Sequence, residues 1–125
     1  MKLRHIAGLL FVALALSGCF KHKSDRENRV TGPVTLNVDN HNWSDIVVYA
    51  LVEGTRHRLG SVTATQKARL RVPETLMPIP GSVELVLDPL GSRGTFRTGV
   101  IQIGMGQEVH ITVENELRMT SWRVQ

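Results

Sequence analysis

The stretch Ile46-Val47-Val48-Tyr49-Ala50-Leu51-Val52 decides the fold of this chain. An unbroken apolar run of seven residues fits a strand in the middle of a sheet. Glu53-Gly54-Thr55 follows directly, and Gly is well suited to tight turns. Arg56 to Val62 comes next, so the sequence predicts a central strand that turns back into a partner strand.

The segments around this pair show the alternation of half-buried strands. Val34, Leu36 and Val38 alternate with polar residues, and similar alternation recurs in three further segments, 68–72, 82–88 and 108–114. Period-two alternation places the apolar side chains on one face of an antiparallel strand. Residues 98–103 and Met119 to Val124 supply the remaining predicted strands. From residue 19 onward the chain has 14 Val and 3 Ala, which favours strands over helices.

Seven or eight short strands, with turns about every eight to twelve residues, predict an all-β, two-sheet antiparallel β-sandwich. An Ig-like and a transthyretin-like Greek key both fit this pattern, and a small closed barrel is the alternative. Asp88-Pro89-Leu90-Gly91 and Gly104-Met105-Gly106-Gln107 are predicted turns, the second of them a hairpin turn. Pro73 to Gly81 is the long connection, and its Leu76, Met77 and Ile79 are expected to fold over an open end of the sandwich.

Residues 1–18 differ in kind from the rest and predict a secretory signal. Met1 to His5 form a short basic start, and Ile6 to Leu16 is an uncharged run of 11 residues. As a helix this run would reach about 16 Å, about half of the hydrocarbon core of a bilayer, so a permanent transmembrane helix is disfavoured. We expect the segment to be cleaved.

Leu16-Ser17-Gly18-Cys19 closes the apolar run and resembles the lipobox of bacterial lipoproteins. The resemblance implies that Cys19 receives a diacylglycerol, that the signal is cut between Gly18 and Cys19, and that the new amino terminus is acylated. Two or three acyl chains, at about 0.8 kcal/mol per buried methylene, would anchor the protein to a membrane. An ordinary signal with an incidental Cys is the alternative. Phe20 is not the Asp that would favour inner-membrane retention in enteric-type bacteria, so the expected location is the outer membrane, facing the periplasm.

A polar segment follows the predicted lipid anchor. Phe20 to Arg29 has four basic and two acidic residues and no apolar periodicity, which is typical of a flexible linker. Residues 19–29 are therefore predicted to be the lipidated Cys with its tether, and residues 30–125 the sandwich domain. The chain carries a net charge of +4, but residues 30–125 contain nine Lys or Arg and nine Asp or Glu. A neutral domain lacks the basic surface of a nucleic-acid binder, so no nucleic-acid partner is expected.

The sequence contains no recognisable catalytic set. It has no G-x-S-x-G, H-E-x-x-H, P-loop or G-x-G-x-x-G motif, and Cys19 is its one Cys. His57 and His110 are expected at outward positions of strands, where a cross-strand pair could bind a metal, but their spacing matches no ligand motif. We therefore predict a protein that is not an enzyme and that needs no metal or other cofactor.

The most distinctive local feature is the polar loop Asp39-Asn40-His41-Asn42-Trp43-Ser44-Asp45 between two predicted strands. As an interaction loop it would use Trp43 as an aromatic anchor and Asp39, His41 and Asp45 as polar contacts. The structural alternative, which turn composition favours, is that the polar residues only make turns and that Trp43 caps the edge of the sandwich. Residues 88–95 form a second predicted loop, a hairpin tip at the far end from the tether.

Several runs of the predicted domain resemble a group of small, uncharacterised bacterial envelope lipoproteins. These runs are Asn42 to Asp45 with Val48-Tyr49, Arg58 to Val62, Asp88 to Ser92, Gly106 to Val109 and Glu114 to Leu117. The resemblance implies a shared scaffold and supplies no catalytic residue. We expect a lipid-anchored envelope protein that is a structural or protein-interaction module with an envelope protein partner. A pilotin-like assembly factor and a periplasmic glycan or small-ligand binding module are the alternatives.

Overall fold

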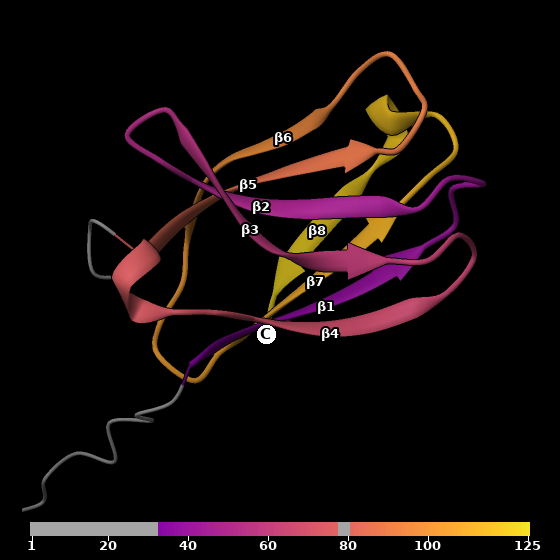
Figure 1. Ribbon diagram of the computed structural model, residues 1–125. Helices are drawn as coiled ribbons and strands as arrows, with labels where there is room; N and C mark the ends of the chain where they lie inside the picture. Colours follow the sequence, from indigo (N-terminus) through magenta and orange to yellow (C-terminus); the bar gives the residue numbers. More distant parts are fainter. Residues whose placement is uncertain (1–32, 78–80) are drawn as a thin grey trace, which may run out of the picture.

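The computed structural model describes residues 33–77 and 81–125. Within these residues the chain forms eight strands in two four-stranded sheets, which Figure 1 shows as two layers. Sheet A has the strand order β4-β1-β7-β8, and sheet B has the order β3-β2-β5-β6. The elements are β1 (Val34–Asn40), β2 (Ile46–Val52), β3 (Thr55–Val62), β4 (Lys67–Val72), the 3-10 turn η1 (Glu74–Leu76), β5 (Ser82–Pro89), β6 (Phe96–Gln102), β7 (Glu108–Val113), the 3-10 turn η2 (Leu117–Met119) and β8 (Ser121–Val124).

This arrangement confirms the predicted all-β, two-sheet sandwich. The described strands form two separate sheets, so the domain is not a closed barrel. An immunoglobulin constant-type domain keeps its first two strands in one sheet, whereas β1 and β2 lie in different sheets here. The strand order therefore argues against the immunoglobulin constant-type arrangement.

One strand pair departs from the predicted antiparallel pattern. All pairs among the described strands are antiparallel except β1 with β7, which run parallel from Thr35 opposite Glu108 to Asn40 opposite Val113. The reason is the crossing that precedes β7. The chain leaves sheet B at the end of β6 and enters sheet A at the end where β1 also begins, so both strands start from the same side.

The core lies between the two sheets and is made by alternate residues of their strands. Leu36 and Ile111 from sheet A and Leu85 and Leu87 from sheet B are at most 1% exposed. Burying one such side chain contributes about 1.5 to 3 kcal/mol. The core therefore fixes the strands, and with them the ends from which the loops leave.

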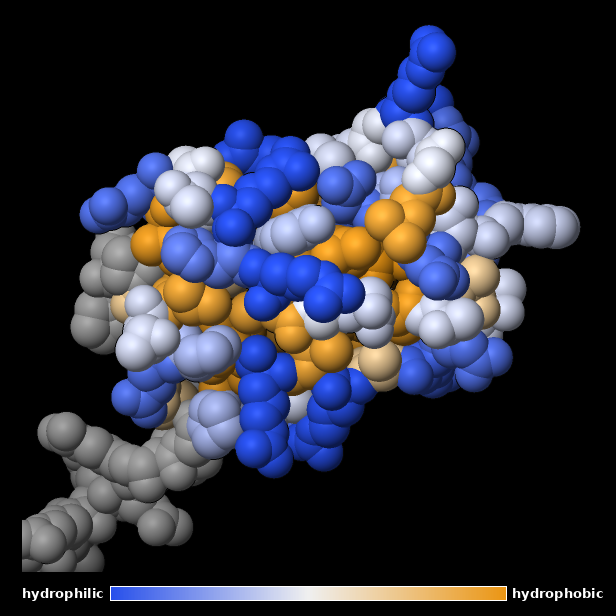
Figure 2. Space-filling model, in the orientation of Figure 1, coloured by the Kyte–Doolittle hydropathy of each residue, from blue (hydrophilic) through white to orange (hydrophobic). Residues whose placement is uncertain are grey.

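The unbroken run that decides the fold is β2, the strand between β3 and β5 in sheet B. Ile46, Val48 and Ala50 face the core and are fully buried, and Val47 on the opposite face is only 6% exposed. On that outer face the Arg56 guanidinium lies 5.9 Å from the centre of the Tyr49 ring. Burial on both faces explains why the run does not alternate. In the view of Figure 2, hydrophobic atoms lie in a band across the domain with hydrophilic side chains crossing it.

The predicted last strand begins later than expected. Met119 belongs to the 3-10 turn η2, whose hydrogen bonds run from the Met119 N–H to the Glu116 carbonyl and from the Thr120 N–H to the Leu117 carbonyl, at 2.8 and 3.1 Å. The strand therefore starts at Ser121. The predicted start at Met119 was wrong because this local turn closes before the chain pairs with β7.

Two predicted turns also differ in detail. Asp88 and Pro89 are the last residues of β5, and the turn runs from Pro89 to Ser92, whose N–H donates a 3.4 Å hydrogen bond to the Pro89 carbonyl. Gly104 to Gln107 does form a turn, closed by a 3.1 Å hydrogen bond from the Gln107 N–H to the Gly104 carbonyl. It is not a hairpin turn, because it joins β6 of sheet B to β7 of sheet A.

The long connection from Pro73 to Gly81 packs as predicted where it is described. Met77 is 8% exposed and belongs to the core, and Leu76 packs against it. Ile79, the third predicted contact, lies outside the described residues.

The loops of the sandwich gather at two ends (Figure 1). Pro33, where the described chain begins, lies at the end that also holds the β2–β3 turn. Four loops lie at the opposite end, which we call the distal end: 41–45, 63–66, 90–95 and 114–120. In neither described range is there a helix that is long and apolar enough to span a bilayer.

Candidate functional site

The loop predicted to bind a partner lies at the distal end and carries the chain from sheet A to sheet B. Asp39 and Asn40 are the last residues of β1, so the loop itself is 41–45. The second predicted loop meets it, because the backbone N–H of Leu90 donates a 2.9 Å hydrogen bond to the carbonyl of Asp45. The fold thus brings together two segments that the sequence singled out separately.

The side chain of Trp43 projects into solvent. Trp43 is 83% exposed, so the expectation that it caps the edge of the sandwich was wrong. Leu90 and Met119, on two other loops of the distal end, are 56% and 67% exposed. Single exposed apolar side chains are ordinary, but here three of them lie on loops of the same end of a small domain, which makes that end a candidate for association. We call Trp43, Leu90 and Met119 the apolar tip.

A buried asparagine holds the loop that carries Trp43. Asn40 is 0% exposed, and its side-chain NH₂ donates to the carbonyls of Ser44, Val62 and Thr63 at 3.0, 3.2 and 3.1 Å. Its side-chain oxygen accepts a 2.9 Å bond from the backbone N–H of Asn42. One side chain therefore joins the 41–45 loop to the end of β3.

Asn42 repeats this arrangement toward the other side. Its side-chain oxygen accepts from the Ser44 N–H at 2.9 Å, and its NH₂ donates to the carbonyls of Glu114 and Asn115 at 3.0 and 3.2 Å. The sequence analysis missed both asparagines as supporting residues. The signal was present, since Asn at positions 40 and 42 can each bond a backbone N–H two residues later, as Asx turns do.

Asp45, predicted as a polar contact for a partner, also has a structural bond. Its carboxylate accepts a 2.9 Å hydrogen bond from the backbone N–H of Ala64 in the 63–66 loop. This bond joins the loop between the sheets to the β3–β4 connection. Asp45 therefore helps to position the loop and has less freedom to contact a partner than the sequence analysis expected.

Asp39 and His41 take part in a chain of charged contacts along the rim. The Lys67 ammonium lies 2.7 Å from the Asp39 carboxylate, and its hydrogen bond lowers the pKa of Asp39 below the ordinary value of 3.8. The His41 ring lies between two carboxylates, 3.2 Å from Asp39 and 3.3 Å from Glu114. These contacts tie the base of the loop to β4 and to the loop that follows β7.

The distal end therefore consists of a fixed loop with an exposed aromatic side chain. Fixing the backbone of a binding loop before association reduces the entropy lost on binding. Trp is also the side chain that most often dominates binding energy in protein interfaces. The arrangement is suited to recognising another molecule.

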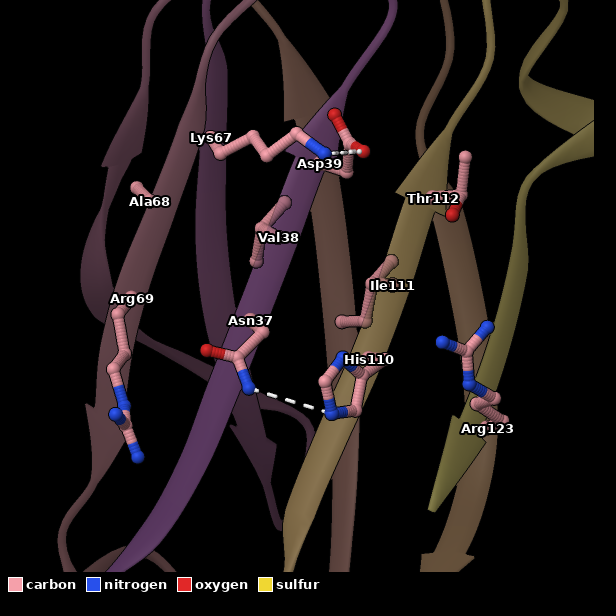
Figure 3. Close-up of a pocket in the computed structure, with 10 residues that line it drawn as sticks. All are labelled: Asn37, Val38, Asp39, Lys67, Ala68, Arg69, His110, Ile111, Thr112 and Arg123. Atoms are coloured by element: carbon pink, nitrogen blue, oxygen red, sulfur yellow. Dashed lines mark hydrogen bonds and ion pairs between the residues drawn. The ribbon is translucent and has the colours of Figure 1, made fainter. Parts of the chain in front are cut away.

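A hollow lies on the outer face of sheet A (Figure 3). It has a volume of about 380 Å³ and crosses all four strands, with Arg69 of β4, Asn37 of β1, His110 of β7 and Arg123 of β8 in one row. We call it the sheet A groove. The Asn37 NH₂ donates to Glu108 at 2.6 Å and lies 3.5 Å from Nε2 of His110, and Glu108 also pairs with Arg69.

The two histidines considered for a metal site lie apart. His110 faces outward on sheet A, as predicted, where it lines the sheet A groove. His57 belongs to sheet B, and it was wrongly expected to face outward: it pairs with the fully buried Ala50 and so lies on the core side of β3. Among residues 33–77 and 81–125, no group of three or more His, Cys, Asp or Glu side chains could hold a metal ion.

The predicted cleavage and lipidation residues, Gly18 and Cys19, lie outside the described residues, as does the predicted tether. Their assignment remains a prediction from the sequence. No protein-family model matches this chain, and no similar protein was found among the curated proteins.

Proposed function

We propose that this protein is a lipid-anchored cell-envelope protein whose sandwich binds a protein partner through the apolar tip and performs no catalysis. The observation that carries the proposal is Trp43, which is 83% exposed on a loop held by buried asparagine side chains. An aromatic side chain that is kept in water by a fixed backbone is poorly explained by folding stability alone.

The position of the apolar tip supports this proposal. The tip lies at the end of the sandwich opposite Pro33, which follows the predicted tether. A ten-residue tether such as 20–29 extends by at most about 33 to 36 Å. An anchor at Cys19 would keep the domain close to the membrane while leaving the tip free to meet a partner in the periplasm.

A protein partner is favoured over a glycan by the hydrogen bonds of the loop. Sugar binding needs polar groups next to the stacking ring. The side chains of Asn42 and Asp45, which lie on either side of Trp43 in the loop, already bond backbone groups of this chain. The pilotin-like assembly factor is a special case of the same proposal, in which the partner is a subunit that the protein escorts to the outer membrane.

Crosslinking in cells tests the proposed partner surface. The full-length protein, its Trp43→Ala variant and a Val100→Ala variant would be crosslinked and purified in parallel. Val100 is the matched control because it is 62% exposed but lies on β6, away from the tip. We expect the same envelope protein to be recovered with the wild type and Val100→Ala, and lost with Trp43→Ala. Equal recovery with all three proteins would refute the proposal.

The glycan alternative and the anchor have their own tests. A glycan ligand would change the tryptophan fluorescence of the wild type and not that of Trp43→Ala, in the absence of any protein partner.

For the anchor, metabolic labelling with a palmitate analogue should tag the wild type and not Cys19→Ala. Equal labelling of both would contradict the lipoprotein assignment.

A further inference from the structure

The outer face of sheet A carries a surplus of positive charge in a domain that is neutral as a whole. Its outward side chains include four cations, Lys67, Arg69, Arg71 and Arg123, and two anions, Asp39 and Glu108. We propose that the sheet A groove on this face binds a phosphate-bearing ligand. This site is separate from the apolar tip and does not depend on the partner proposed for it.

Among the described cations that line the groove, Arg123 is the one without an ion pair. Lys67 pairs with Asp39, and Arg69 pairs with Glu108. Arg123 makes no ion pair or side-chain hydrogen bond with the residues that the structure describes, yet it lines the groove. A guanidinium presents two parallel N–H groups that match two oxygens of a phosphate.

Two further donors lie on the same face beside Arg123. His110 is directly opposite Arg123 in the β7–β8 pair, so the two side chains project from the same side of the sheet. Thr112 lies two residues further along β7, and its hydroxyl has no partner within residues 33–77 and 81–125. Figure 3 shows the Arg123 side chain turned along the strands toward Thr112.

The polar side-chain contacts of His110 with the described residues lie at its Nε2 atom. The NH₂ group of Asn37 lies 3.5 Å from Nε2 of His110 and also donates to Glu108 at 2.6 Å. The Glu108 carboxylate also lies 3.6 Å from Nε2, so the role of each nitrogen depends on the tautomer. His110 donates from Nδ1 in the tautomer whose Nε2 accepts from Asn37, and from both nitrogens when it is protonated.

The donors of the groove favour a phosphate over a carboxylate. A phosphate monoester has three acceptor oxygens for the three donors, and it carries about −1.5 to −2 at neutral pH. Among the described cations that line the groove, Arg123 is the one left to neutralise that charge, because Lys67 and Arg69 are paired and Arg71 lies outside the groove. A carboxylate carries a single charge and two oxygens. A soluble phosphate monoester and a lipid headgroup would both present phosphate oxygens to the groove. The phosphodiester of phosphatidylglycerol has only one negative charge and two unesterified oxygens, so the monoester is the better match to the three donors.

Fluorescence of Trp122 provides the measurement. The chain has two tryptophans, so Trp43→Phe leaves Trp122, the neighbour of Arg123 on β8, as the single reporter and also removes the tip from the experiment. The full-length variant in uncharged detergent micelles would be titrated with inorganic phosphate, glycerol 3-phosphate and acetate. A parallel titration would add phosphatidylglycerol to the micelles.

We expect saturable binding of at least one phosphate probe and weaker binding of acetate. In the same background, Arg123→Gln should weaken the phosphate affinity by about tenfold or more, and Thr112→Glu should abolish binding by placing a carboxylate in the groove. Arg93→Gln is the matched control, since it removes the same charge from the 90–95 loop and should leave the affinity unchanged.

The lipid titration separates the two sources of phosphate. Binding of glycerol 3-phosphate in uncharged micelles would identify a soluble ligand, and binding only of phosphatidylglycerol would identify a headgroup. The proposal is wrong if no phosphate probe saturates, if acetate binds as tightly as phosphate, or if Arg93→Gln weakens binding as much as Arg123→Gln. None of these results bears on the partner of Trp43.

Discussion

The backbone N–H of Trp43 donates a 3.0 Å hydrogen bond to the side-chain oxygen of Asn115, across 72 residues of sequence. This bond joins the loop between the sheets to the loop between β7 and β8. With the bonds from Asn40 and Asn42, it fixes the backbone beneath an aromatic ring that itself touches little of the domain. The distal end therefore combines a fixed main chain with an exposed side chain, which is the arrangement on which the proposed function rests.

Replacing Asn40 should destabilise the domain more than replacing a half-buried asparagine on the outer face of sheet A. Asn40→Ala leaves three carbonyls and the Asn42 N–H without their bonds at a site that is fully buried. We expect the free energy of unfolding to fall by about 2 to 3 kcal/mol, which lowers Tm by about 8 °C or more in a domain of this size. Urea denaturation of the purified protein measures the change.

Asn37→Ala is the control for this prediction. Asn37 is on the same strand, but its side chain lies on the outer face of sheet A, where water can replace its bonds. Its loss should cost less than about 1 kcal/mol. Equal costs for Asn37→Ala and Asn40→Ala would show that the buried bonds do not hold the loop.

Removing the Trp43 side chain should leave stability nearly unchanged. An 83% exposed side chain loses little contact when it is truncated, so Trp43→Ala should change the free energy of unfolding by no more than about 0.5 kcal/mol. Leu36→Ala, at a site that is 0% exposed, should cost about 2 to 5 kcal/mol in the same assay. A large loss with Trp43→Ala would mean that the ring packs on the domain, and the loss of partner binding could then not be assigned to the ring.

The sequence predicted the strands well because burial leaves a local pattern. The continuous run at 46–52 and the alternation at 34–40 depend only on which side chains face the core. The neighbours of each strand depend on tertiary pairing, and alternation says nothing about them. The local sequence pattern could therefore not predict that β1 and β7 pair in parallel. Nor could it predict that the chain crosses from sheet B to sheet A at Gly104 to Gln107.

How far each candidate site could be predicted depended on whether its residues lie together in the sequence. The 39–45 loop stood out by composition, but the composition of a loop cannot tell an exposed Trp43 from a capping one. The sheet A groove was invisible in the sequence. Arg69, Asn37, His110 and Arg123 come from four separate strands, and only the pairing of those strands places them in one row.

The ion pair between Asp39 and Lys67 predicts a small loss of stability in acid. Because the folded-state pKa of Asp39 lies below its ordinary value of 3.8, the unfolded chain binds more protons between these two values. The contribution is thus fully present above about pH 4 and is lost as the pH falls through the folded-state pKa. Since the Lys67 side chain is 79% exposed, its size should be at most about 1 kcal/mol.

Asp39→Asn tests this prediction. We expect the variant to be less stable than the wild type at about pH 7 and to approach it in stability at about pH 3, as measured by urea denaturation at both values. Lys67→Gln should behave in the same way, because it removes the other half of the pair. A difference between wild type and Asp39→Asn that is equally large at both pH values would show that the effect does not come from the charge of Asp39.

The turn between β2 and β3 predicts a stabilising substitution. Glu53 and Gly54 form a two-residue connection between Val52 and Thr55, with φ angles of 48° and 81°. A left-handed backbone suits Asn and Gly and is unfavourable for Glu, and Asn-Gly is the preferred pair in such hairpins. Glu53→Asn should therefore raise the free energy of unfolding by about 0.5 to 1 kcal/mol. Glu53→Gln is the control, since it removes the same charge without the Asn preference, and it should leave stability unchanged. If both variants were equally stabilised in urea denaturation, the gain would come from the charge and not from the backbone conformation of the turn.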